Sequence, residues 1–180
     1  MNIDISCTGI DVATAMLGDF PKQVPKVVSR AINRANTAAK TAAARKIVSG
    51  YNIKSREVSA TIRLKPSSPS TLRAIMESQG GVIPLTKFKA TKGAVGAFVQ
   101  VKKGSGGYIP HAFLTAFKSG HSGVFWRTSH KRLPIKELYG PSVPGMLGTD
   151  NVSAFIEKRT TQVFNERLDH EVDAVLRGYV

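Results

Sequence analysis

Cysteine, tryptophan and acidic residues are scarce in this chain. Its 180 residues include one cysteine, one tryptophan and 12 Asp plus Glu, against 26 Lys plus Arg. A single cysteine, Cys7, excludes an internal disulfide and a zinc site built from several thiolates. We expect Cys7 to be a small, buried apolar side chain. Such cysteine usage fits synthesis in a reducing compartment.

Long apolar runs are missing as well. No stretch of 18 apolar residues is present, so the sequence predicts no membrane-spanning helix and no membrane partner. The first 16 residues carry acids where a secretory signal peptide would carry basic residues, and they lack a compact apolar stretch. We therefore expect no signal peptide.

Motifs that carry catalysis are also absent from the sequence. The histidines are not spaced as in HExxH, no GxSxG is present, and the glycine-rich residues 102–107 (KKGSGG) do not form a P-loop. Acids are too sparse between residues 51 and 140 for their spacing to imply a catalytic pair; they are Glu57, Glu77 and Glu137. We expect no enzymatic activity, no metal and no cofactor. We expect solvated or hydrogen-bonded side chains at the four histidines, which are His111, His121, His130 and His170.

Positive charge is what the chain has in excess. The formal net charge is +14 and the isoelectric point is near 10.2, which favours a polyanion or an acidic protein as partner. Residues 21–50 hold seven basic residues and no acid, whereas residues 141–180 hold four basic residues and six acids. The candidate contacts to DNA or to an acidic partner are Lys87, Lys89, Lys92, Lys102 and Lys103. Contact through lysines would be independent of base sequence. A solvated, mobile hairpin tip is the alternative for residues 102–107.

The apolar pattern predicts an α+β fold. Residues 24–49 and 150–176 show apolar stripes of helical period, with Pro25 in the first turn of one helix and Asp150 or Asn151 capping the other. Between them we expect a short helical turn at 55–60 and an extended connection at 82–88. We expect strands at 61–65, 71–77, 96–101, 111–117 and 123–128. We predict an antiparallel sheet of about four to six strands with both long helices on one face. Residues 1–20 would be an arm or short strand, and residues 21–180 a single domain.

Residues 131–147 (KRLPIKELYGPSVPGML) combine three prolines and two glycines with many apolar side chains. Proline and glycine prevent a single regular element here. The apolar content is too high for a solvated linker, so we expect this segment to pack on its own domain or on a neighbouring chain.

This segment and its surroundings resemble the prophage minor tail protein Z family of long-tailed phages. The most specific string is residues 137–144 (ELYGPSVP). The similarity also covers residues 119–125 (SGHSGVF), 131–135 (KRLPI), 51–54 (YNIK), 84–88 (PLTKF) and 99–103 (VQVKK). It extends over roughly residues 20–176, and the first twenty residues show nothing to match.

The resemblance implies a structural virion protein without catalytic residues. Such proteins are similar in role to tail completion proteins. We expect this one to be made in the host cytoplasm and to act at the head-proximal end of the tail. Its partners would be further copies in a hexameric ring, the tail terminator, the head-to-tail connector and the end of the double-stranded genome.

The residues predicted to dock subunits or rings are Leu133, Ile135, Leu138, Tyr139, Pro141, Val143 and Pro144. Burial of this turn within one domain is the alternative to docking. The alternative function is a sequence-independent nucleic-acid-binding protein that acts outside the virion.

Overall fold

A computed structural model describes residues 2–5, 9–18, 20–93, 95–129 and 131–178. Cys7 and His130, for which the sequence predicted environments, lie outside these residues. The elements in chain order are β1 (Asn2–Ile5), α1 (Gly9–Met16), α2 (Val24–Gly50), α3 (Ser55–Ser59), β2 (Ile62–Lys65), β3 (Ala74–Ser78), β4 (Ile83–Pro84), the 3-10 turn η1 (Leu85–Lys87), β5 (Lys89–Lys92), β6 (Gly96–Lys102), β7 (Ser105–Pro110), β8 (Ala112–Ala116), β9 (Ser122–Arg127), β10 (Ile135–Glu137), β11 (Tyr139–Gly140), α4 (Val143–Leu147) and α5 (Asp150–Leu176). The α+β class is confirmed.

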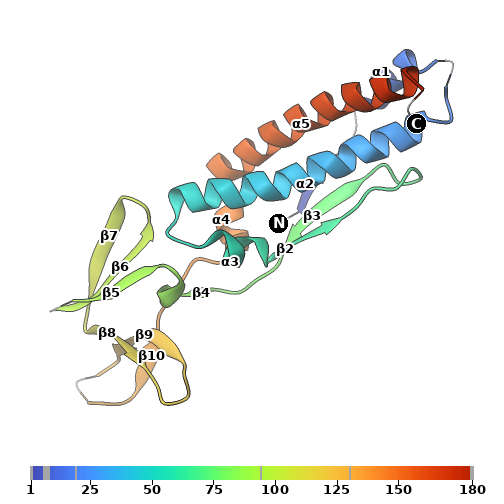
Figure 1. The fold of residues 1–180 in the computed structure, drawn as a ribbon. Coiled ribbons are helices and arrows are strands. Elements are labelled where there is room, and N and C mark those ends of the chain that lie inside the picture. The colour runs from blue at the N-terminus through green and yellow to red at the C-terminus, as the bar shows by residue number, and fades with distance from the viewer. Residues whose placement is uncertain (1, 6–8, 19, 94, 130, 179–180) are drawn as a thin grey trace.

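Two long antiparallel helices, α2 and α5, form one half of an elongated molecule (Figure 1). Their packing stripe is rich in alanine on the α2 side, where Ala35, Ala39 and Ala43 are fully buried. Small side chains let the two backbones come close along their length. Pro25 lies in the first turn of α2, as predicted. Helix α5 begins differently from the prediction, because Thr149 occupies the capping position and Asp150 lies in the first turn.

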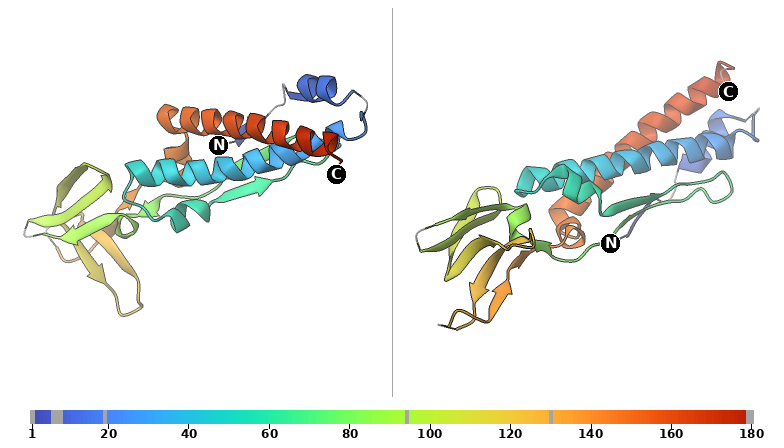
Figure 2. Two further views of the ribbon diagram at one scale, coloured as in Figure 1. Left: turned by 45° about the horizontal axis from the view of Figure 1, so that its top comes forward. Right: turned by 60° about the horizontal axis from the view of Figure 1, so that its bottom comes forward.

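The strands do not form the single sheet that the sequence predicted. They form sheets β1-β3-β2, β5-β6-β7 and β10-β9-β8, and the short pair β11-β4, and every pairing within them is antiparallel. Only the first sheet lies beside α2, whereas the other strands gather beyond the α2 C-terminus (Figures 1 and 2). We call residues 83–140, which contain β4 to β11, the β-lobe. Alternation of apolar and polar side chains in the sequence indicates a strand, but long-range packing decides which strand it pairs with. The sequence therefore predicted strands but not their division into separate sheets.

Several elements of the β-lobe differ from the sequence-based prediction. Residues 102–107 are not simply a loop, because Lys102 ends β6 and Ser105 begins β7, which leaves Lys103 and Gly104 as the turn. Gly104 has φ +78°, a conformation that favours glycine. The extended connection predicted at 82–88 contains the 3-10 turn η1.

Two groups of buried side chains hold the molecule together. One group lies between α1, the first half of α2 and the second half of α5, and includes Leu17, Ile32 and Val172. The other begins at the C-terminal half of α2 and continues through α4 into the β-lobe, where it includes Val124. The second core therefore fixes the β-lobe against the helices.

Candidate docking and nucleic-acid surfaces

The proline-rich segment folds back onto its own chain at its C-terminal end. In α4, Val143, Met146 and Leu147 are each 1% exposed. The Ser142 hydroxyl accepts a hydrogen bond from the Gly145 amide at 3.2 Å and so caps this short helix. Val143 was predicted to dock subunits, but its burial in the core leaves almost none of its side chain to present to a neighbour. Pro144, another predicted docking residue, is half-buried in the first turn.

The middle of the segment is fixed by backbone hydrogen bonds. The Leu138 amide donates to the Val124 carbonyl at 2.8 Å, and its carbonyl accepts from the Leu85 amide at 3.3 Å. The Leu138 side chain is half-buried against the core that enters the β-lobe. Ile135 is also half-buried, opposite Arg127 in the β9-β10 pair. These two residues contribute mainly to the folded subunit.

The remaining predicted docking residues are exposed. Leu133 is 65% exposed before β10, and Tyr139 is 48% exposed in β11. Pro141 is exposed too and lies with Tyr139 at one side of a groove of about 580 Å³. Apolar side chains dominate the groove, including Tyr51, Leu85, Val99, Val101 and Ile109. The structure therefore joins part of the predicted docking set to apolar residues of η1, β6 and β7 and to Tyr51, which follows α2.

Gly140 explains why this turn needs a glycine. A Cβ at this position would lie 2.7 Å from the Phe88 ring, closer than side-chain atoms pack. Phe88 is itself buried in the core. The glycine thus lets β11 approach β4 and η1 while Tyr139 and Pro141 on either side stay accessible.

A polar cluster lies beside this groove. Tyr139 donates its hydroxyl proton to Glu137 Oε2 at 2.8 Å, and His121 Nε2 lies 3.1 Å from the same oxygen. The hydrogen bond to Glu137, with smaller effects of burial and of the Glu137 charge, raises the pKa of Tyr139 above its ordinary value. Glu137 Oε1 is buried and has no hydrogen-bond partner among the described residues. The sequence did not reveal this cluster, because His121 and Glu137 are 16 residues apart.

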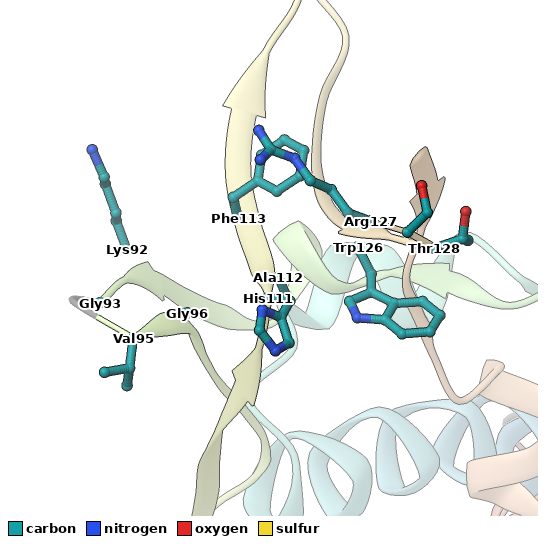
Figure 3. Close-up of a pocket in the computed structure, with 11 residues that line it drawn as sticks. Lys92, Gly93, Val95, Gly96, His111, Ala112, Phe113, Trp126, Arg127 and Thr128 are labelled. Atoms are coloured by element: carbon teal, nitrogen blue, oxygen red, sulfur yellow. The ribbon is translucent and has the colours of Figure 1, made fainter. Parts of the chain in front are cut away.

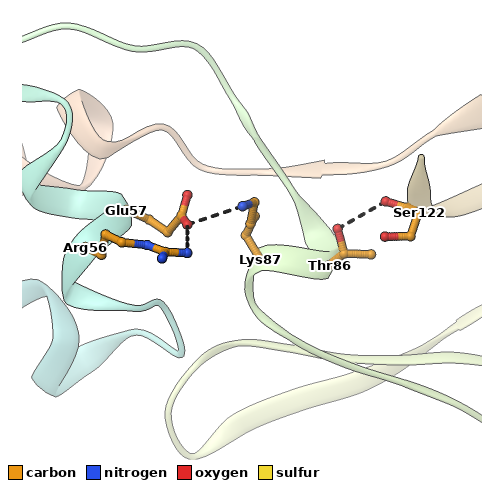
Figure 4. Close-up of polar contacts among 5 residues, drawn as sticks. All are labelled: Arg56, Glu57, Thr86, Lys87 and Ser122. Carbon is orange, nitrogen blue, oxygen red and sulfur yellow. Dashed lines mark hydrogen bonds and ion pairs between the residues drawn. The ribbon is translucent and has the colours of Figure 1, made fainter. Parts of the chain in front are cut away.

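The predicted basic contacts differ in their surroundings. Lys87 Nζ lies 3.2 Å from Glu57 Oε1, and the Arg56 guanidinium lies 3.7 Å from the same oxygen (Figure 4). Lys87 therefore helps to hold η1 against α3, and part of its charge is compensated. None of the other four predicted lysines forms an ion pair with a described residue, and all are exposed: Lys89, Lys92, Lys102 and Lys103.

Lys102 and Lys103 are placed by contacts to the end of α2. The Lys103 amide donates to the Gly50 carbonyl at 2.8 Å, and the Asn52 amide donates to the Val101 carbonyl at 2.9 Å. The Asn52 side chain adds a 3.0 Å hydrogen bond to the Gln100 carbonyl. These bonds hold the base of the β6-β7 hairpin, so both lysines project from a fixed position.

The β-lobe holds most of the excess positive charge. Its 58 residues carry ten Lys and Arg and one acid, Glu137, which is a net charge of +9 with the histidines neutral. The whole chain carries +14. A surface with this balance attracts phosphate groups and acidic protein faces alike.

A second depression of the β-lobe lies between the β5-β6 turn and the sheet β10-β9-β8. Its volume is about 700 Å³, and its lining combines the cations Lys92 and Arg127 with the imidazole of His111 and the exposed indole of Trp126 (Figure 3). Small and polar residues complete the lining, among them Gly96, Thr128 and Ser129. No part of this depression was predicted from the sequence except Lys92.

The model of the prophage minor tail protein Z (GPZ) family matches residues 7–180. The chain belongs to this family. The match begins well before residue 20, so it includes α1, where the motifs alone showed no similarity. No curated protein and no solved structure was found to match the chain.

As a member of a minor tail protein family, the chain is a structural protein of the phage tail. Proteins of this class are typically not enzymes. Among the described residues, no helix is long and apolar enough to cross a membrane. Within the same residues, no three His, Cys, Asp or Glu side chains gather where a metal ion could bind.

Proposed function

We propose that this minor tail protein completes the tail at its head-proximal end, as a subunit of a ring between the tail terminator and the head-to-tail connector. The exposed apolar groove at Tyr139 and Pro141 is the observation that carries the proposal. Tyr139, Gly140 and Pro141 of the ELYGPSVP string contribute to its lining, and the residues that follow them in α4 are buried in the subunit's own core. A rigid apolar surface on a fixed support loses little entropy when a neighbour docks on it.

The neighbour that we assign to this groove is another copy of the chain. Ring interfaces are heterologous, so each subunit presents two different surfaces, and rotation closes the ring. We expect six copies. Leu133 belongs to the proposed docking surface because it is exposed, whereas Val143 is left out because it is buried.

The β-lobe would meet the end of the double-stranded genome in such a ring. Its net charge of +9 and its exposed lysines support contact with phosphates, independent of base sequence. The same charge supports the second candidate function, a nucleic-acid-binding protein that acts outside the virion. The groove favours the tail role, because a protein that only coats nucleic acid has no need of an apolar docking surface.

Phage carrying an early stop codon in this gene would test the tail role. We expect normal heads and tails of normal length that either fail to join or join into non-infectious particles, as judged by electron microscopy and plaque assay. A plasmid copy of the intact gene should restore infectivity. Infectious particles in normal yield without complementation would refute the structural role and leave the nucleic-acid function.

The groove itself is tested by Tyr139→Ala with Tyr108→Ala as its matched control. Tyr108 is also an exposed tyrosine, but it neighbours Ile109 in β7 and so points to the opposite face of the sheet from the groove. We expect Tyr139→Ala to give a folded protein that fails to complement, and Tyr108→Ala to complement. An unfolded Tyr139→Ala protein, measured by circular dichroism, would instead support the intramolecular role of this turn.

A further inference from the structure

The depression beside Trp126 has two chemically different sides. In Figure 3, Lys92 and Arg127 point to one side, while Trp126 and His111 point to the other. The described residues that line it include no Asp or Glu. Trp126 and Arg127 are consecutive at the end of β9, so their side chains lie on opposite faces of the sheet, and the depression touches both. One side therefore offers positive charge and the other offers aromatic surface, and the volume of about 700 Å³ lies in the range of small-molecule sites.

Trp126 is left accessible although its sheet neighbours are buried. Val124 and Ala112 lie on the same face of the sheet and are 0% and 4% exposed, whereas Trp126 is 39% exposed. Trp126 is paired with Ala112 on one side and with Lys136 on the other, so its backbone is held by two strands. An indole in this position is a rigid platform with a free face.

One cation of the site, Arg127, is held in place as well. The Arg127 guanidinium lies over the Phe113 ring, 5.1 Å from its centroid, and forms no ion pair with a described residue. Such stacking orients the guanidinium while its hydrogen-bond donors stay available. Lys92 is exposed at the end of β5.

The backbone at the base of the depression has two uncommon conformations. His111 has φ +60°, which is uncommon for a residue other than glycine, and it lies at the sharp change of direction between β7 and β8. Gly96 has φ +155°, and a Cβ there would lie 2.3 Å from the Ile109 carbonyl oxygen. The backbone of His111 is therefore strained, and strain next to an open depression indicates a functional constraint.

We propose that this depression binds an unpaired nucleotide of single-stranded nucleic acid. The base stacks on Trp126, and phosphates further along the same strand pass the end of β9 to contact Lys92 and Arg127 on the other side. Stacking on aromatic side chains within a positively charged groove is how proteins bind single strands without sequence preference. A base inside a duplex is already stacked between its neighbours, so its face is not available to the indole. The proposal deepens the nucleic-acid contact of the proposed function, and it does not depend on where in the tail the protein acts.

Trp126 is the only tryptophan of the chain, so its fluorescence reports on this site alone. We would titrate the protein with a thymidine dodecamer and with a blunt duplex of equal phosphate content. Fluorescence anisotropy of labelled nucleic acid would measure affinity in parallel. We expect the single strand to quench Trp126 as it binds and the duplex to bind with little quenching.

Three variants separate stacking from general attraction. Trp126→Ala should weaken single-strand binding about tenfold and leave duplex binding unchanged, because one stacked base contributes on the order of a tenfold factor. Trp126→Phe keeps an aromatic face and should restore most of the affinity. Tyr108→Ala, which changes an exposed aromatic residue outside the depression, should behave as the parent protein does. Circular dichroism of each variant would confirm the fold.

Several results would overturn the proposal. Saturating single-strand binding without a change in Trp126 fluorescence would place the strand elsewhere. An equal loss of single-strand and duplex affinity in Trp126→Ala would show that the indole has no selective role. Failure of the dodecamer to bind at all would exclude the site, whereas the duplex titration and the stop-codon phage would still test the proposed function separately.

Discussion

Replacing Lys102 and Lys103 with alanine should reduce the salt dependence of duplex DNA binding by a calculable amount. With Lys89, Lys92 and these two lysines all in contact with phosphate, about four counterions would be displaced, and the slope of log K against log salt would be about −3.6. Affinity would then fall about 150-fold from about 50 to about 200 mM salt. The double variant should show a slope of about −1.8 and a loss of about 12-fold over the same interval.

The assay is fluorescence anisotropy with a labelled duplex at several salt concentrations. The control is Lys22→Ala with Lys26→Ala, which removes the same charge from exposed positions at the start of α2, at the other end of the molecule (Figure 1). This control should keep the slope of the parent protein. The backbone bond from residue 103 to Gly50 survives in the alanine variant, so the hairpin should keep its position. A parent slope near zero, or equal slopes for both double variants, would refute the assignment of the β-lobe as the DNA surface.

Three further predictions concern the turn and its support. Met146→Ala should lower the free energy of unfolding by about 2–5 kcal/mol, because Met146 is 1% exposed, and a loss below about 1 kcal/mol in urea titration would contradict its burial. Gly140→Ala should destabilise by about 1–3 kcal/mol, since the new Cβ would contact Phe88, and unchanged stability in the same assay would contradict the close approach. The hydrogen bond from Tyr139 to Glu137 favours the neutral phenol, so its stabilisation is present below the ordinary pKa of 10.0 and is lost as pH rises through the raised value. In an absorbance titration, Tyr139→Phe should remove a late-ionising tyrosine, and removal of an ordinary one would contradict the bond.

The long helices were predictable because their apolar residues recur with helical period over 27 residues in each. The ends of α2 agree within one residue, since Pro25 and Gly50 mark them in the sequence. Strand β7 could not be found in this way. Its sequence, SGGYIP, contains two glycines and a proline and has no alternation of apolar and polar residues. The strand forms because β6 supplies its hydrogen-bond partners, and a local pattern does not contain that information.

The candidate sites also differ in whether their residues are close together in the sequence. The ordered turn was predictable, because ELYGPSVP is a contiguous string whose residues stay together in the fold, and its docking role stays a prediction. The depression at Trp126 was not, because Lys92, His111 and Trp126 come from separate segments and meet only where two sheets join. Burial also had to be learned from the structure. Val143 and Tyr139 belong to the same string, yet one lies in the core and the other is exposed.

Glu137 shows how the β-lobe keeps its positive surface next to an apolar groove. It is the lobe's only acid, and its side chain is only 13% exposed. Gly123, where a Cβ would lie 2.8 Å from Glu137 Oε1, leaves space for the carboxylate, and Tyr139 and His121 contact its other oxygen. The negative charge is therefore turned inward and offsets little of the surface charge that an approaching polyanion meets. Replacing Gly123 with alanine would place a Cβ against both the Phe125 ring and the carboxylate, and we expect the carboxylate to move outward. Such a change should weaken DNA binding without altering any lysine.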